Sequence, residues 1–381
     1  MKKSLIKLPF VAIAILGLVL TSSVMFWTGC SDQQESASPT ATSQDQAFSK
    51  LTENSEAVRE VMAVQNQNTA RFMEDPNVVG TATGLTDDGR LAIMVYLEKS
   101  ASTIKGAKQT FAIPRELNGV PVVTQVTGKF KALKSGGGGV SHTAKQTPPI
   151  QLGTSGGWRY DLANGYCCGG TLGSLVSKGG SQYILSNYHV LEADIVNGGN
   201  SRTANAGDPV IQPGLIDVSC NANNAQNVAT LSGLKSLPGT NVDAAIAPVI
   251  SGMVRTDGSI LEIGVIKAGT GVAAFLNQAV KKSGRTSGLT RSTVSGLNAT
   301  VSITYDNECA GGTAFTKTFT GQIVLKGGRF IQSGDSGSLM VQDVTTAPQA
   351  VGLCFAGSST NGIANPIGQV LSWAGATMVG Q

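Results

Sequence analysis

The stretch "RFIQSGDSGSLMV", residues 329–341, places Ser336 between a Gly-Asp pair and a following glycine. Apolar residues flank this turn on both sides, a pattern typical of a turn between two strands. A tight turn of this kind presents the serine hydroxyl and bare backbone N–H groups to one point in space. A nucleophilic serine needs that arrangement, but an ordinary loop would use the same residues. The interpretation therefore depends on whether the chain supplies a base for Ser336.

Only two histidines are available for this task. His142 lies in "SGGGGVSHTAKQTPP", residues 135–149, where glycine, proline and the absence of periodicity predict a linker, so we assign it no role. His189 lies in "QYILSNYHVLEAD", residues 182–194, where an apolar strand runs out into a loop. A lone histidine there is usually a strand-end residue bonded to a carbonyl. Because the Ser336 turn follows downstream and no other suitable base competes, His189 is the predicted base.

An imidazole that activates serine needs a carboxylate on its other nitrogen to hold the tautomer and stabilise the imidazolium. Asp243 in "TNVDAAIAPVI", residues 240–250, is favoured because it stands at the start of an apolar strand. The rival carboxylates are Asp194, Asp208 and Asp217. The chain order His, Asp, Ser excludes the α/β-hydrolases, which begin with serine, and the subtilisins, which begin with aspartate.

Several blocks together resemble those of trypsin-like, chymotrypsin-fold serine proteases. They are "YCCGGTLGSLV", "NVDAAIAPV", "SGRTSG", "SGDSGSLMV" and "VGLCFAG". The glycine-rich style resembles bacterial α-lytic-type proteases and plant narrow-leaf trypsin-like proteins. The resemblance covers residues 153–381 and implies an all-β protease domain of two six-stranded barrels with the active site between them.

The resemblance also implies roles for individual residues. The N–H groups of Gly334 and Ser336 would form the oxyanion hole. Phe330 and Gly357 would belong to the specificity pocket, and a phenylalanine in place of an acid favours cleavage after small or apolar residues.

The carboxylate of Asp335 needs a buried cation, and "KKSGRTSGLT", residues 281–290, offers Arg285. The rivals for this role are Lys281, Lys282 and Arg291. Three positions depart from the trypsin pattern. Val190 and Gln332 replace cysteines, which leaves Cys168 without its usual partner, and Phe355 replaces a serine that supports the catalytic aspartate.

Composition agrees with many short strands, because the 381 residues include 48 glycines and only 14% charged residues. Residues 51–133 predict a small α+β domain, with a helix after Thr52 and Ser55 and two hairpin-like pairs. This domain is either a pro-region that assists folding or covers the cleft, or a simple spacer or docking domain. Residues 134–152 predict a glycine- and proline-rich linker.

The N-terminus reads as a secretory signal, with the basic start "MKKSLIK", an apolar run and the ending "TGC". Residues 1–30 resemble a bacterial lipoprotein signal with Cys30 as the lipidated residue, although Trp27 stands where leucine is usual. An uncleaved membrane anchor is the alternative. Residues 31–50 are polar and predict a flexible tether. The protein is therefore expected outside the cytoplasm, anchored to a bacterial membrane by lipid or secreted.

The remaining cysteines are odd in number, so at least one stays unpaired unless chains cross-link. They are Cys167, Cys168, Cys220, Cys309 and Cys354. Their spacing resembles no zinc site, and the predicted chemistry needs no metal or cofactor. The net charge of +4 is too mild to indicate a nucleic-acid surface. The predicted function is a serine endopeptidase acting on polypeptides. Alternatives are an inactive protease used for binding and a structural lipoprotein, and the oligomeric state stays open.

Overall fold

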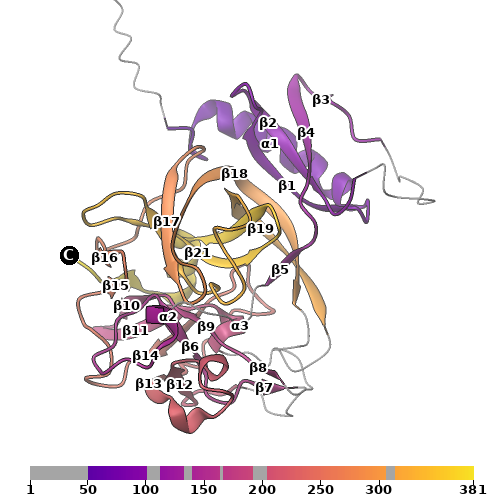
Figure 1. The fold of residues 1–381 in the computed structure, drawn as a ribbon. Helices are drawn as coiled ribbons and strands as arrows, with labels where there is room; N and C mark the ends of the chain where they lie inside the picture. Colours follow the sequence, from indigo (N-terminus) through magenta and orange to yellow (C-terminus); the bar gives the residue numbers. More distant parts are fainter. Residues whose placement is uncertain (1–49, 101–111, 133–139, 164–165, 192–203, 306–313) are drawn as a thin grey trace, which may run out of the picture. The chain divides into compact units, whose positions relative to one another are not determined.

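The computed structural model describes residues 50–100, 112–132, 140–163, 166–191, 204–305 and 314–381. These residues are mostly β-strand with few helices, which confirms the predicted β-rich class (Figure 1). The signal peptide, Cys30 and nearly all of the predicted tether lie outside the described residues. Among the helices that the structure describes, none has the length and apolar character needed to cross a membrane.

The first part of the described chain contains one long helix and five strands. They are α1 (Glu56–Met73), β1 (Val78–Leu85), β2 (Leu91–Leu97), β3 (Glu116–Leu117), β4 (Val120–Val126) and β5 (Phe130–Ala132).

A second group of elements follows up to residue 265. It consists of α2 (Val140–Thr143), β6 (Thr154–Trp158), β7 (Leu162–Ala163), β8 (Tyr166–Cys167), β9 (Gly170–Leu172), β10 (Ser174–Lys178), β11 (Ser181–Ser186), α3 (Tyr188–Leu191), β12 (Pro209–Gln212), η2 (Leu215–Asp217), η3 (Ala222–Asn224), β13 (Gln226–Thr230), β14 (Ala245–Pro248), β15 (Ser259–Ile260) and β16 (Gly264–Val265).

The last group contains the longest strands. It consists of β17 (Ala279–Gly284), β18 (Gly288–Tyr305), β19 (Phe315–Lys326), β20 (Leu339–Gln342), β21 (Ala350–Gly357), β22 (Asn361–Pro366), α5 (Ile367–Ala374) and β23 (Thr377–Met378).

Within the described residues the strands form an 11-stranded sheet and two 4-stranded sheets, besides two short pairs. The large sheet has the order β17-β20-β21-β22-β19-β18-β1-β2-β4-β3, with β5 pairing both β18 and β21. The 4-stranded sheets have the orders β14-β11-β10-β23 and β13-β12-β6-β9. The buried apolar side chains form several separate hydrophobic clusters. Closure into two six-stranded barrels stays a prediction.

The N-terminal segment contains helix α1 and a first hairpin. Val58, Val61 and Phe72 are buried on one face of α1, at the spacing of successive helical turns. Strands β1 and β2 pair antiparallel around a turn that contains Asp87, Asp88 and Gly89, and Gly89 has a positive φ. Strands β3 and β4 form a second hairpin across Asn118 and Gly119.

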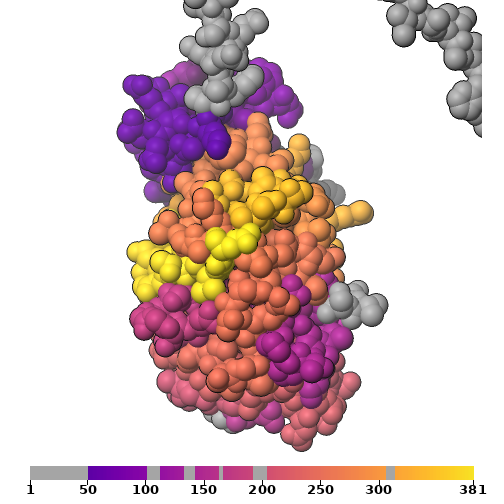
Figure 2. All heavy atoms as spheres, turned by 90° about the vertical axis from the view of Figure 1, so that its left-hand side faces the viewer, coloured from indigo at the N-terminus to yellow at the C-terminus, as the bar shows by residue number. Residues whose placement is uncertain are grey.

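The N-terminal segment shares its sheet with the rest of the described chain. Strand β1 pairs antiparallel with β18, and residues from Lys50 to Gln381 form one compact unit. The two parts also touch where Thr52 bridges Phe275 and the Leu276 N–H donates to the Leu51 carbonyl at 3.0 Å. In Figure 2 the indigo atoms of this segment adjoin orange atoms from the later part of the chain. The sequence pattern predicted the elements of this segment, and the pairing came only from the structure.

Part of the predicted linker has a defined structure. His142 lies in the short helix α2 and is buried, with Nδ1 2.8 Å from the Gly153 carbonyl and Nε2 2.6 Å from Glu262. Ile150 is fully buried in a cluster that includes Trp158. The linker pattern indicated no partner for His142, whereas the structure holds both of its ring nitrogens, one by the nearby Gly153 carbonyl and the other by Glu262, 120 residues along the chain.

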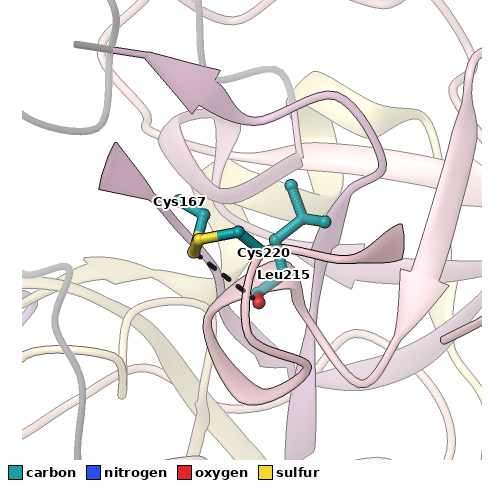
Figure 3. The surroundings of a disulfide bond; sticks show 3 residues. All are labelled: Cys167, Leu215 and Cys220. Carbon is teal, nitrogen blue, oxygen red and sulfur yellow. Dashed lines mark hydrogen bonds between the residues drawn. A yellow bond between two sulfur atoms is a disulfide. The ribbon is translucent and has the colours of Figure 1, made fainter. Parts of the chain in front are cut away.

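A disulfide joins Cys167 of β8 to Cys220 (Figure 3). It ties two positions with a sequence separation of 53, close to the Leu215 carbonyl. Cys168 is disulfide-bonded as well. Cys354 is a free, buried thiol. A disulfide of this kind is expected in a protein that folds in an oxidising compartment.

Candidate active site

The turn around Ser336 depends on two glycines with left-handed backbone. Gly334 has φ 95° and Gly337 has φ 93°. A Cβ at Gly334 would collide with Thr286 Oγ1, and one at Gly337 would collide with Ser186 Oγ. No other residue fits both the conformation and the space. The turn is therefore packed tightly against neighbouring strands, and Ser336 itself is fully buried.

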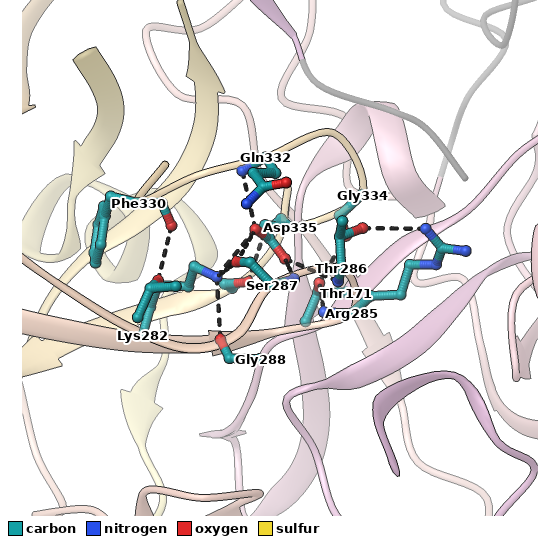
Figure 4. Close-up of polar contacts among 12 residues, drawn as sticks. Thr171, Lys282, Arg285, Thr286, Ser287, Gly288, Phe330, Gln332, Gly334 and Asp335 are labelled. Atoms are coloured by element: carbon teal, nitrogen blue, oxygen red, sulfur yellow. Dashed lines mark hydrogen bonds and ion pairs between the residues drawn. The ribbon is translucent and has the colours of Figure 1, made fainter. Parts of the chain in front are cut away.

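The carboxylate of Asp335 supports this turn from beneath (Figure 4). Its Oδ1 accepts hydrogen bonds from the N–H groups of Thr286 and Ser287, and its Oδ2 accepts one from the N–H of Gln332. The Lys282 ammonium lies 3.0 Å from Oδ2, and neither side chain has any exposed surface. Asp335 is thus a buried, paired carboxylate, as its position in the sequence predicted.

The cation that pairs with Asp335 is Lys282 and not the predicted Arg285, although both belong to the 281–290 block. Arg285 follows the end of β17, and its Nη2 and Nε bind Asp217 at 2.5 and 2.8 Å. Asp217 also accepts a hydrogen bond from Ser155. Because Lys282 lies within β17 and Arg285 lies beyond it, their side chains leave the backbone in different directions. Lys282 reaches Asp335 and Arg285 reaches η2.

The structure brings together His189 and Asp243, the residues proposed from the sequence as base and orienting acid. His189 lies in α3 directly after β11, and Asp243 lies directly before β14, the strand that pairs with β11. The two side chains meet with Nδ1 2.5 Å from Oδ2, and they are 2% and 0% exposed. Asp243 is held in turn by the Asn365 side chain, which accepts from its N–H at 2.7 Å. The rival Asp217 is bound to Arg285 instead.

Ser336 lies next to the element that carries His189. The Ser336 carbonyl accepts a hydrogen bond from the Thr171 N–H at 2.9 Å. A Cβ built on Gly170 would lie 2.6 Å from the Val190 side chain and 2.9 Å from the Ser336 carbonyl. The Ser336 hydroxyl donates to the Phe355 carbonyl at 3.2 Å. His189 Nε2 is buried and has no hydrogen-bond partner in the described part of the chain.

Tyr305 is a member of the site that sequence reasoning missed. Its hydroxyl donates to Asp243 Oδ2 at 2.8 Å, the same oxygen that His189 Nδ1 contacts. Burial comes first and the Asp243 charge second in holding the pKa of Tyr305 well above its ordinary value. The only signal in the sequence was indirect, because Phe355 replaces the serine that supports this aspartate in trypsins.

The two residues predicted for the specificity pocket lie in different surroundings. Phe330 is 3% exposed and packs in a hydrophobic cluster with Val58 and Cys354. Gly357 ends β21, where it faces Lys131 of β5. Strand β5 lies between β21, to which it is antiparallel, and β18, to which it is parallel. A specificity pocket at Phe330 and Gly357 stays a prediction.

No group of three or more metal-ligating side chains occurs in the stretches that the structure describes. No family model matches the chain, and no curated protein matches it. Solved structures do match. A glutamic acid-specific serine protease is 20% identical with a TM-score of 0.39, covering 60% of this chain and 100% of its own. Thermobifida fusca protease A is 18% identical with a TM-score of 0.39, covering 61% and 99%. An α-lytic protease homologue, N4, is 18% identical with a TM-score of 0.39, covering 60% and 98%. In fold, the chain is similar to bacterial serine proteases of the chymotrypsin type.

Proposed function

We propose that this protein is a serine endopeptidase with Ser336 as nucleophile, His189 as base and Asp243 as the orienting acid. The observation that carries the proposal is the buried contact of His189 Nδ1 with Asp243 Oδ2 at 2.5 Å. It leaves Nε2 as the ring nitrogen that can accept a proton, beside the Ser336 turn. The finer architecture of two barrels with the site between them is part of the same proposal.

In the proposed reaction the Ser336 hydroxyl rotates from the Phe355 carbonyl toward His189 Nε2. Oγ then bonds to the scissile carbonyl carbon while Nε2 takes the hydroxyl proton. Asp243 keeps the other ring proton on Nδ1 and stabilises the imidazolium. His189 next gives its proton to the leaving amine as the C–N bond breaks. Water, deprotonated by His189, releases the acyl group and restores Ser336.

The negative oxygen formed in each half of the reaction needs fixed donors. The N–H groups of Gly334 and Ser336 are assigned to it, because the left-handed φ of Gly334 turns its peptide relative to its neighbours. The Gly334 carbonyl accepts a hydrogen bond from Thr171 Oγ1 at 2.9 Å, which fixes the next peptide of the turn, between Gly334 and Asp335. Asp335 and Lys282 hold the same turn from below.

A fluorophosphonate probe tests the proposal, because such probes react with serines that a histidine activates. Ser336 should carry the label in the wild-type chain, as located by mass spectrometry of peptides. Labelling should fall by about 10⁴-fold in H189A, since triad members act as a unit. Ser336→Ala should abolish the label, which tests whether labelling depends on the Ser336 hydroxyl. Equal labelling of wild type and H189A would contradict the proposal.

We further infer that residues 51–133 act as a pro-region that covers the substrate groove. The support is the position of β5, which pairs with β21 through Ala356 and Gly357, directly after Phe355. The Phe355 carbonyl accepts the Ser336 hydroxyl. An extended peptide bound there would use the same backbone groups, as in other cases of strand addition. A spacer or docking role remains the alternative.

Weakening β5 tests this second proposal in the full chain. Phe130 of β5 is fully buried among Tyr96, Tyr305 and Phe355. Phe130→Ala removes that anchor, at a cost of about 3–5 kcal/mol to local packing. If β5 covers the groove, fluorophosphonate should label Ser336 faster in F130A than in wild type. Val126→Ala, at an exposed position of β4, is the matched control. Equal rates in F130A and wild type would favour the spacer.

We also infer export with a lipid anchor at Cys30, which rests on the signal-like N-terminus. Incorporation of radiolabelled palmitate into the wild-type protein, lost in C30A, would support the anchor. Absence of the label from the wild type would contradict it.

A further inference from the structure

Tyr305 places a neutral hydrogen-bond donor on the acid of the proposed site. It is the last residue of β18 and is 2% exposed. Its hydroxyl and His189 Nδ1 both contact Asp243 Oδ2, at 2.8 and 2.5 Å. The remaining oxygen, Oδ1, accepts only the His189 backbone N–H at 3.3 Å among its described contacts. The oxygen that binds the imidazole is therefore also the one that Tyr305 holds.

The phenol ring is fixed in this position by two aromatic contacts. It stacks on Phe315 with ring centroids 4.8 Å apart and an interplanar angle of 6°. It meets the His189 ring edge-on at 5.9 Å and 69°. The backbone is fixed as well, because Tyr305 and Phe315 are register partners in the β18–β19 pair. A hydroxyl held this firmly loses little further freedom when it binds the carboxylate.

The chemistry of the donor suits a buried acid. A carboxylate with no exposed surface needs hydrogen bonds to stay ionised, and a second charge would compete with the imidazolium. The tyrosine hydroxyl supplies a hydrogen bond without adding a charge. The charged or titratable groups that contact it are Asp243 and the His189 ring. At neutral pH the hydroxyl keeps its proton and can only donate to this oxygen.

We propose that Tyr305 is a positioning residue that holds the Asp243 carboxylate toward His189 and so keeps the imidazole in the Nδ1–H tautomer. This proposal rests on the proposed peptidase function. In the resemblance to trypsins, Phe355 stands at the position of the serine that supports the catalytic aspartate, and its side chain has no hydroxyl. Its ring instead packs against Phe319 and belongs to the same hydrophobic cluster as Tyr305. The support for the acid has thus moved from β21 to the end of β18.

The test compares Tyr305→Phe with Tyr96→Phe in the full chain. Both tyrosines are buried in the same cluster, and each change removes a single oxygen, but Tyr96 has no contact with Asp243 among its described interactions. The rate of fluorophosphonate labelling, measured at a series of probe concentrations, gives both the maximal rate and the probe concentration at which the rate is half-maximal. Y305F should lower the maximal rate about tenfold and leave that concentration within about twofold, as expected for loss of one hydrogen bond to a charged group. Y96F should lower neither.

A spectroscopic measurement makes the test independent of activity. The proton between His189 Nδ1 and Asp243 gives a far-downfield ¹H NMR signal, which disappears in H189A. Y305F should shift this signal and Y96F should not. If Y305F does not fold, uniform 3-fluorotyrosine should shift it in the Y96F background, because the more acidic phenol donates more strongly. An unshifted signal in the fluorinated or Y305F protein would overturn the assignment of Tyr305. An unlabelled Ser336 in the wild type would instead overturn the peptidase function alone.

Discussion

Replacing Lys282 by methionine tests whether the buried ion pair maintains the nucleophile turn. The Lys282 ammonium lies 3.0 Å from Asp335 Oδ2, and both side chains are completely buried. Removing one partner of such a pair typically costs about 3–5 kcal/mol, because it leaves an uncompensated charge. Asp335 keeps three backbone N–H donors, from Thr286, Ser287 and Gln332. We therefore expect the lower end, about 3 kcal/mol in the free energy of unfolding.

The neighbouring Lys281 supplies the matched control. It is 6% exposed and donates to the Val344 carbonyl at 2.7 Å, away from Asp335. Urea unfolding should show a smaller loss in K281M than in K282M, and Ser336 should react with fluorophosphonate more slowly only in K282M. The double variant K282M/D335N removes both charges and should recover part of the lost stability. A K282M protein as stable and reactive as K281M would refute the reasoning.

Three further predictions concern the cysteines and the covered groove. Burial raises the pKa of Cys354 to about 12, so the native thiol should resist iodoacetamide at pH 8. Since the unfolded thiol titrates near pH 8.5, the thiol should make stability fall as pH rises from about 8.5, and this fall should be smaller in C354A than in wild type between about pH 8.5 and 10. The Cys167–Cys220 disulfide joins positions with a sequence separation of 53. Its removal in the C167A/C220A variant should lower the free energy of unfolding in urea by about 2–5 kcal/mol. An unchanged urea midpoint would contradict this. Strand β5 ends at Ala132, which pairs with Ala356, so mass spectrometry should find chains cut in the segment that follows β5 in wild type and intact chains in S336A. The same cut in S336A would show that another protease makes it.

The sequence alone was sufficient to nominate the candidate residues whose setting is local. The Ser336 turn is encoded in a few adjacent residues, because only glycine tolerates the backbone at Gly334 and Gly337. His189 followed from the scarcity of histidines and from its place at a strand end. Asp243 followed from its place before an apolar strand, and the pairing of β14 with β11 agrees with that inference. The content of strands and of helix α1 likewise follows from local periodicity.

Contacts between residues far apart in the chain came only from the tertiary structure. The sequence pointed to the 281–290 block as the source of the cation for Asp335, but the structure shows that Lys282, within β17, reaches Asp335 and that Arg285, just after β17, reaches Asp217. Tyr305 lies 62 residues from Asp243, and nothing near it in sequence indicates a carboxylate partner. The same holds for β5 against β21 and for His142 against Glu262. Local propensity acts over a few residues, whereas these partners are set by how distant strands pair and which side chains the packed sheets bring together.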